Sequence, residues 1–172
     1  MADDQADNTS ERLLPQVYDE LRKLAAARMA NERPGQTISP TGLVHEVWMR
    51  LSKDDPAWDS KSHFFGAAAE SMRRILIDRA RKKAASKHGG EQRRADLDLE
   101  QLEFAPDDRL VLLDEALTRF AELEPVKAEL VKLRYFAGCS IKDAAELLNI
   151  STATADRYWT YSRAWLQREM QS

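Results

Sequence analysis

Apolar residues recur at intervals of three and four along most of the chain, which is the spacing of amphipathic helices. The first half carries three such stripes, over residues 14–29, 43–51 and 65–76. Of the adjacent Phe64 and Phe65, we expect one to pack inward. No segment alternates between apolar and polar residues as a half-buried strand does, so the pattern predicts an all-α protein.

The second half continues the helical pattern with stripes over residues 110–123 and 126–136, so Leu123 and Val126 are expected to face inward. Pro125 starts the second of these helices, and Gly138 is expected just past its end in the left-handed conformation. Ser140 and Asp143 resemble a capping box that opens the next helix.

Residues 140–163 have the plan of a helix-turn-helix, with a short helix, a tight turn and a longer helix from about 152 to 170. Ala145 is small enough for the two helices to cross closely, and Asn149 accepts the left-handed backbone of a turn. Ala155 or Trp159 supplies an inward apolar residue. Short hydroxyls and an arginine at the leading end of the second helix are typical of contact with phosphates and base edges. A plain helical hairpin is the alternative.

The composition fits one domain or two small ones: 172 residues, of which 43% are hydrophobic and 32% charged. The longest apolar run, residues 64–69, is far too short to cross a bilayer. The first residues are acidic and polar, unlike a signal peptide, and residues 1–10 are expected to form a disordered tail. With a single cysteine, the chain suits a reducing cytoplasm.

The net charge of -3 conceals a basic block at residues 73–94 followed by an acidic block at 96–124. A basic block favours binding to a polyanion, most often nucleic acid, although a solvated helix face is the alternative. Residues 89–108 contain a glycine pair, a proline and the switch in charge, which is typical of a linker.

Catalytic chemistry finds little support in the sequence. His45 precedes Glu46, but no second histidine stands at helical spacing, so no metal or other cofactor is expected. Cys139 stands at a helix start, where its pKa could fall, yet no nearby residue supplies an orienting base. We therefore expect a protein that is not an enzyme.

The segment LRYFAGCSIKDAAELLNISTATADRYWTYSRAWL resembles region 4 of the extracytoplasmic-function (ECF) group of bacterial RNA polymerase sigma factors. Region 2 of the same group is similar to two earlier segments, LLPQVYDELRKLAAARMANERPGQTISPTGLVHEVWMRL and WDSKSHFFGAAAESMRRILIDRARKKAA. The sequence pattern of these segments is similar to that of the ECF branch abundant in planctomycetes. The resemblance covers about residues 13–170.

The resemblance implies two small helical domains joined by an acidic linker: region 2 at residues 11–88, the linker at 89–108 and region 4 at 109–172. It implies binding to core RNA polymerase, through the beta-prime clamp helices and the beta flap, and to promoter DNA. The protein would recognise the -35 and -10 elements and stabilise the melted strand. An anti-sigma factor is a further partner common in the group.

Site residues are implied position by position. Those matching the family's -10 surface, including a loop that captures an unstacked base, are Trp58, Asp59, Ser60, Lys61, Arg73, Arg74, Asp78, Arg81 and Lys82. Those matching the -35 reading helix are Ser151, Thr152, Thr154, Asp156, Arg157 and Tyr161. Those matching the polymerase-docking helix, residues 41–51, are His45, Glu46, Trp48 and Arg50; core packing is the alternative for Trp48.

Three positions depart from the family pattern. Asp156 replaces a usual basic residue and would be repelled by phosphates, although it could accept a hydrogen bond from a cytosine amino group. Arg74 replaces a common asparagine, and Gly42 replaces a usual acid. Two other interpretations remain open: a stand-alone helix-turn-helix regulator, and an interaction protein that sequesters a sigma factor.

Overall fold

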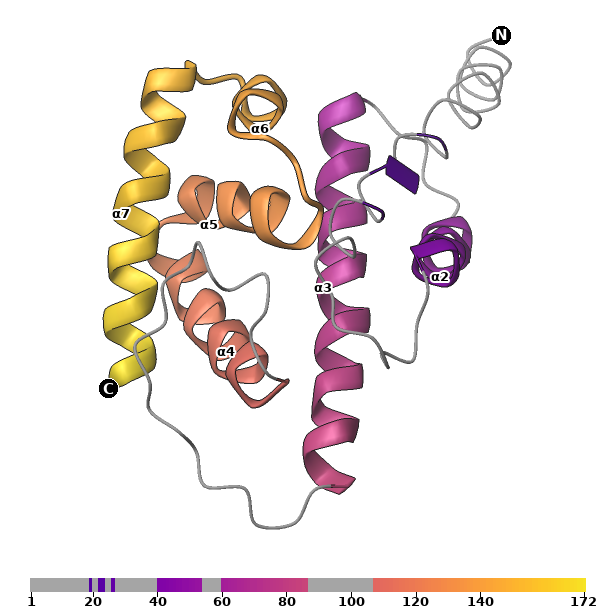
Figure 1. The fold of residues 1–172 in the computed structure, drawn as a ribbon. Helices are drawn as coiled ribbons and strands as arrows, with labels where there is room; N and C mark the ends of the chain where they lie inside the picture. The colour runs from indigo at the N-terminus through magenta and orange to yellow at the C-terminus, as the bar shows by residue number, and fades with distance from the viewer. Residues whose placement is uncertain (1–18, 20–21, 24–25, 27–39, 54–59, 87–106) are drawn as a thin grey trace, which may run out of the picture.

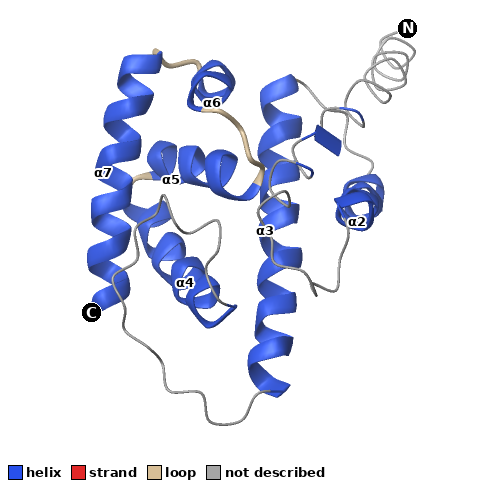
Figure 2. Cartoon of the chain, viewed as in Figure 1, coloured by secondary structure: helices blue, strands red, loops and turns tan. Residues whose placement is uncertain are grey.

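The structure is a computed structural model that describes residues 19, 22–23, 26, 40–53, 60–86 and 107–172. Every regular element in these ranges is helical, so the predicted all-α class is confirmed (Figure 2). The elements are α2 (Pro40–Lys53), α3 (Lys61–Ser86), α4 (Asp107–Leu123), α5 (Pro125–Val131), η2 (Lys132–Phe136), α6 (Ile141–Leu148) and α7 (Thr152–Gln171). Most of the predicted stripe at 14–29 and of the predicted linker lies outside the described residues.

Helix α3 runs through the middle of the molecule (Figure 1). It contacts α2 on one side, and α4, η2 and α6 on the other. Helix α7 lies at the far side from α2 and contacts α4, α5 and α6. The N-terminal ends of α3 and α7 point toward the same end of the molecule (Figure 1).

Serine side chains cap three of the helices. The amide of His63 donates to Ser60 Oγ over 3.1 Å at the start of α3. Ser140 Oγ accepts from the amide of Asp143 over 3.0 Å, which confirms the serine half of the predicted capping box. Ser151 caps α7 in the same way. Each cap satisfies an amide that lacks a partner within its own helix, so these serines define where the helices begin.

The corner between α4 and α5 corrects two sequence predictions. Leu123 and Val126, expected to face inward, are 67% and 48% exposed. They flank Glu124 and Pro125, where the chain turns and the helical stripes of α4 and α5 do not join. In α5, the first buried apolar residues are Ala128 and Leu130.

After Val131 the helix widens into a π-helical turn, η2, which the sequence pattern did not predict. Gly138 follows with φ of 72°, as expected of a residue just past a helix end. The amide of Cys139 donates to the carbonyl of Leu133 over 2.9 Å, which closes this end of the helix.

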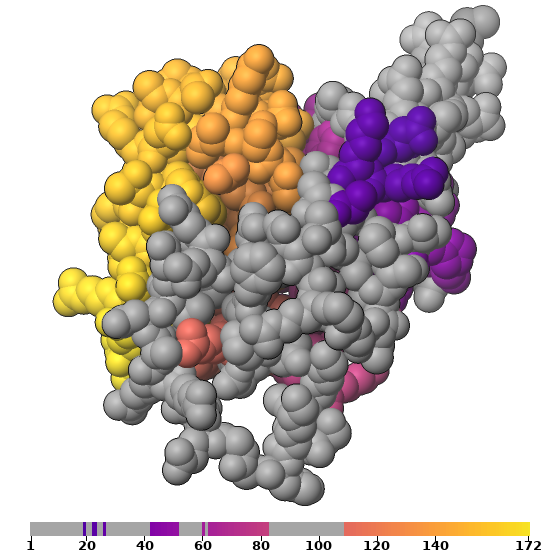
Figure 3. Space-filling model, in the orientation of Figure 1, coloured from indigo at the N-terminus to yellow at the C-terminus, as the bar shows by residue number. Residues whose placement is uncertain are grey.

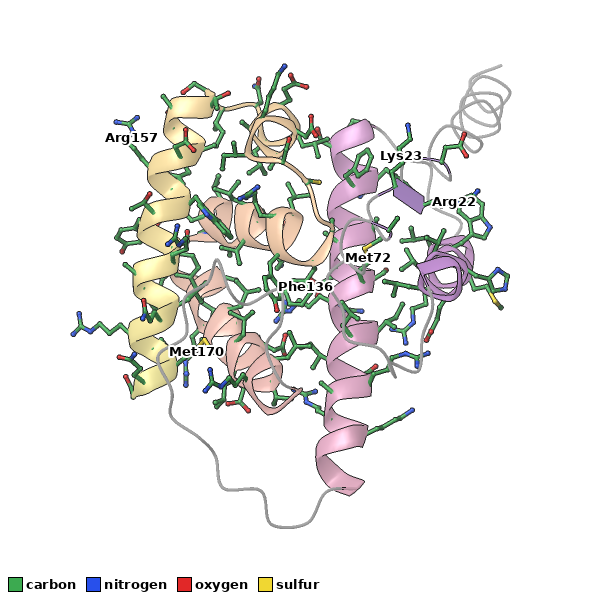
Figure 4. All side chains as sticks on the ribbon, in the orientation of Figure 1. Arg22, Lys23, Met72, Phe136, Arg157 and Met170 are labelled. Atoms are coloured by element: carbon green, nitrogen blue, oxygen red, sulfur yellow. The ribbon has the colours of Figure 1, made fainter. Side chains whose placement is uncertain are left out.

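Buried side chains from both halves form one continuous core. Phe64 and Phe65 are both buried, with their rings edge to face at 5.6 Å, so the expectation that one packs inward understates their burial. Both can be buried because α3 is covered on two sides. Phe136, fully buried at the end of η2, lies between α5 and α3 (Figure 4).

Candidate nucleic-acid and polymerase-binding site

Helices α6 and α7 form the predicted helix-turn-helix. Ala145 and Ala155 are buried where the two helices meet, so Ala155 fills the apolar position for which Trp159 was the alternative. Asn149 ends α6 with φ of 56° and ψ of 43°, the predicted left-handed turn. The amide of Ile150 donates to the carbonyl of Ala145 over 3.0 Å and closes the turn.

The leading end of α7 is open to solvent. Ser151, Thr152, Asp156 and Arg157 are exposed, and α7 forms one edge of the molecule (Figure 3). Arg157 projects outward from this edge (Figure 4). Free amide groups at such an end favour a phosphate, and side chains on this face could enter a major groove.

Three of the predicted -35 residues also bond to one another. Ser151 Oγ accepts from the amide of Thr154 over 3.1 Å, and the hydroxyls of these two residues are 2.9 Å apart. Arg157 Nη2 donates to Thr154 Oγ1 over 3.2 Å. The cap and the arginine are therefore already positioned before any DNA is bound.

Tyr161 is placed differently from the other predicted -35 residues. It follows Thr154 by two helical turns, about 10 Å along the axis. Its ring stacks on Phe120 with centroids 6.3 Å apart, and Lys127 Nζ lies 4.8 Å from its centroid. Packing against α4 and α5 thus accounts for this side chain, although it is partly exposed.

The predicted -10 surface of α3 is divided by the fold. Arg74, whose side chain is 70% exposed, and Arg81 and Lys82 are exposed cations on α3. Arg74 also pairs with Glu70, and Arg81 with Asp114, each over 3.4 Å. Exposed Asp78 lies within 3.8 Å of Arg50 on α2. Ser60 is exposed and caps α3, which Lys61 begins, whereas Trp58 and Asp59 lie outside the described residues.

Arg73 is turned toward α4 instead of toward solvent. Its Nε donates to Asp114 Oδ1 over 2.6 Å, and its Nη2 donates to Thr118 Oγ1 over 2.8 Å. The side chains of Arg73 and Asp114 are only 12% and 13% exposed. In this arrangement the guanidinium of Arg73 is occupied by protein and not presented to DNA.

Glu70 connects α3 to η2 beside this pair. Its carboxylate lies 3.4 Å from Lys132 Nζ and also pairs with Arg73 and Arg74 on its own helix. Burial raises the pKa of Glu70, but the charges of Lys132, Arg73 and Arg74 outweigh burial and hold the pKa below its ordinary value of 4.5. Glu70 is therefore ionised at neutral pH.

Helix α2 presents the predicted polymerase contacts unequally. His45 is exposed and Trp48 is half-buried. Glu46 pairs with Arg79 of α3 over 3.1 Å, and Arg50 lies between Glu46 and Asp78, so these two side chains hold α2 on α3.

The sequence pattern did not single out Met49, which is 50% exposed one turn after His45. An apolar residue within a predicted stripe is expected to be buried. Met49 lies outside the i, i+3, i+4 register of the buried residues Val44, Val47 and Leu51. This offset is the sequence signal that could have predicted its exposure.

Metal sites and membrane spans are both absent from the described residues. No group of three or more His, Cys, Asp or Glu side chains in this part of the chain could hold a metal ion. Within the same ranges, no helix is long and apolar enough to cross a lipid bilayer.

Comparison with protein families gives a match over residues 2–172 to the family described as ECF sigma factor. Comparison with curated proteins and with solved structures gave no significant match. The family match covers both the α2–α3 half and the helix-turn-helix half. The chain belongs to the ECF sigma factor family and is thus an RNA polymerase sigma factor, a transcription initiation factor and not an enzyme.

Proposed function

We propose that the leading end of α7 reads the -35 element in the major groove, with Thr152, Asp156 and Arg157 as its principal contacts. The observation that carries this proposal is the solvent-exposed, capped start of α7 on a well-packed α6. Ser151 and Thr154 position Arg157, and the N-terminal end of α7 favours a phosphate. Asp156 accepts a hydrogen bond from a cytosine amino group, the major-groove donor with which carboxylates usually pair. Tyr161 contributes at the margin of this surface.

The -10 element is bound by α3 and by the residues before it. Arg74, Arg81 and Lys82 supply phosphate contacts, supported by their exposure on one helix. Trp58, Asp59, Ser60 and Lys61 form the loop that holds an unstacked base, which an aromatic ring and polar groups together can do. Asp78 borders this face, and Arg73 joins it once it is released from Asp114.

Core RNA polymerase docks through α2, on the beta-prime clamp helices. His45 and Met49 lead this surface because both are exposed one turn apart. Trp48 contributes its exposed edge, while Glu46 and Arg50 keep α2 in place against α3. Region 4, beginning at residue 109, docks on the beta flap, and the linker at 89–108 spans the space between the two sites.

Several finer features belong to the same proposal. The protein acts in the cytoplasm, where the polymerase is, and an anti-sigma factor restrains it. It belongs to the planctomycete-type branch of the family. A stand-alone regulator is not favoured, because it leaves the polymerase-docking helix α2 and the basic face of α3 without a use.

Run-off transcription with core polymerase, this protein and its own upstream DNA tests the proposal. A new start site that depends on the protein supports it. Trp58→Ala is expected to impair open-complex formation more than assembly with core enzyme, and equal losses in both assays would assign Trp58 to folding. A chain that binds promoter duplex tightly alone but never binds core polymerase would instead be a regulator.

A further inference from the structure

The exposed face of α7 carries methyl groups as well as charges. Ala153 and Thr160 are both exposed on this helix. The proposed base contacts Asp156 and Arg157 are exposed between them. Since an α-helix has 3.6 residues per turn, a step of seven residues returns to within about 20° of the same direction, so Ala153 and Thr160 share one line along the helix. Arg157, which projects outward from the edge of the molecule, stands between these two methyl groups (Figure 4).

The hydroxyl of Thr160 is already engaged by its own helix. Its Oγ1 donates to the carbonyl of Asp156, one turn earlier, over 3.0 Å. Threonine often makes this bond in helices, and the bond occupies the only proton of the hydroxyl while it selects one side-chain rotamer. Thr160 therefore has no proton to donate to a base, and its methyl group is the part of this exposed side chain that is suited to a base edge.

A methyl group on this face has one apolar counterpart in the major groove. Thymine is the base that presents a methyl group there, on C5, and the methyl groups of threonine and alanine contact it. The polar neighbours on α7 suit other bases, because a carboxylate accepts from cytosine and an arginine donates to guanine. A methyl group beside them would add a base that neither charged side chain identifies.

We propose that Thr160 is a specificity-determining residue for the upstream promoter element, and that its methyl group packs on the C5 methyl group of a thymine. The proposal rests on the function proposed above for α7. Thr160 follows Arg157 by about 4.5 Å along the helix axis, and successive base pairs are about 3.4 Å apart. The thymine is therefore expected one or two base pairs from the base pair that Arg157 contacts. Ala153 offers a second methyl group on the other side of Arg157.

Replacement of thymine by deoxyuridine tests this contact. Core polymerase assembled with the full chain first selects promoters from a duplex pool that is randomised over the upstream element. Each thymine of the selected element is then replaced by deoxyuridine, which pairs as thymine does and lacks only the C5 methyl group. At the thymine that Thr160 contacts, we expect competition to show a loss of about fourfold, the contribution of one buried methyl group.

Two variants of Thr160 separate its methyl group from its hydroxyl. Thr160→Ser keeps the hydroxyl and removes the methyl group, so the thymine and uracil promoters should compete equally. Thr160→Val keeps a methyl group and removes the hydroxyl, so the preference for thymine should remain. Thr118→Ser is the matched control, because Thr118 is exposed on α4 and also donates to the carbonyl four residues earlier, that of Asp114, over 2.9 Å. It should retain the full preference, and circular dichroism establishes that each variant is folded.

The outcomes separate this inference from the proposed function. A selected element in which no thymine can be distinguished from uracil overturns the inference, and so does a preference that persists in Thr160→Ser. Loss of the preference in Thr160→Val, but not in Thr160→Ser, would assign the reading to the hydroxyl and overturns it as well. In each of these cases Arg157→Ala still alters the selected sequence if α7 reads the DNA. If no upstream sequence is selected at all, the proposed function itself fails, and this inference fails with it.

Discussion

The guanidinium of Arg134 lies 4.8 Å from the ring centroid of Trp159. Its Nη1 also donates to the carbonyl of Cys139 over 3.3 Å. One side chain on η2 therefore holds both the loop that leads into α6 and the middle of α7. This relationship couples the π-helical turn to the position of α7, the helix that we propose reads the DNA.

Arg134→Ala should destabilise the protein by about 1–2 kcal/mol, because it removes a partly buried cation–π contact and a hydrogen bond to a carbonyl. Urea denaturation measures the change. Arg168→Ala, an exposed arginine near the end of α7, is the matched control and should change stability by less than about 0.5 kcal/mol. Equal effects of the two variants would show that Arg134 does not hold α7.

The left-handed turn at Asn149 predicts opposite effects for two small substitutions. Asn149→Ala places an ordinary side chain at φ of 56° and should cost about 1 kcal/mol. Asn149→Gly has no side chain to strain and should leave stability equal or slightly higher. Thermal denaturation of the three proteins gives the order, and a stable alanine variant would mean that the turn adopts another conformation.

Arg157→Ala should alter sequence preference in the upstream promoter element, with a loss of about 1–3 kcal/mol at the preferred base pair if the contact is to a base edge. Competition among promoter variants in the presence of core polymerase measures this preference. Lys142→Ala removes an exposed charge from α6 and serves as the control. A uniform loss across all sequences would assign Arg157 to a phosphate instead.

Replacing Arg81 and Lys82 together with alanine should reduce promoter opening. It should also lower the slope of log affinity against log salt by about 2, because each of the two side chains would neutralise one phosphate. The matched control replaces exposed Arg22 and Lys23, an adjacent basic pair outside α3 (Figure 4). An unchanged slope in the α3 variant would show that these two side chains do not bind phosphates.

Glu70 makes stability dependent on pH in a defined direction. Its pKa is lowered in the folded protein, so its contribution is present above the ordinary value of 4.5 and is lost as pH falls through the folded value. Urea denaturation between about pH 6 and pH 3 should show stability falling, and Glu70→Gln should flatten that fall. An identical pH profile for both proteins would remove Glu70 from the ion-pair network.

The local chemistry of the sequence determined the helices and the helix-turn-helix. Ser140, Asn149 and Gly138 act through their own backbone or through residues three positions away, so their neighbours in the chain suffice to predict them. The charge and hydroxyl pattern at the start of α7 likewise identified an exposed surface that the fold leaves open.

Only the tertiary structure decided which of the basic residues on α3 face solvent. Arg73 and Arg74 are adjacent in the chain and alike in chemistry, yet Asp114, 41 positions after Arg73, holds one and not the other. Leu123 and Val126 are exposed for a related reason, since the corner between α4 and α5 interrupts a periodicity that each helix alone satisfies. Periodicity and capping are properties of short segments, whereas pairing across α3 and α4 depends on how distant segments meet.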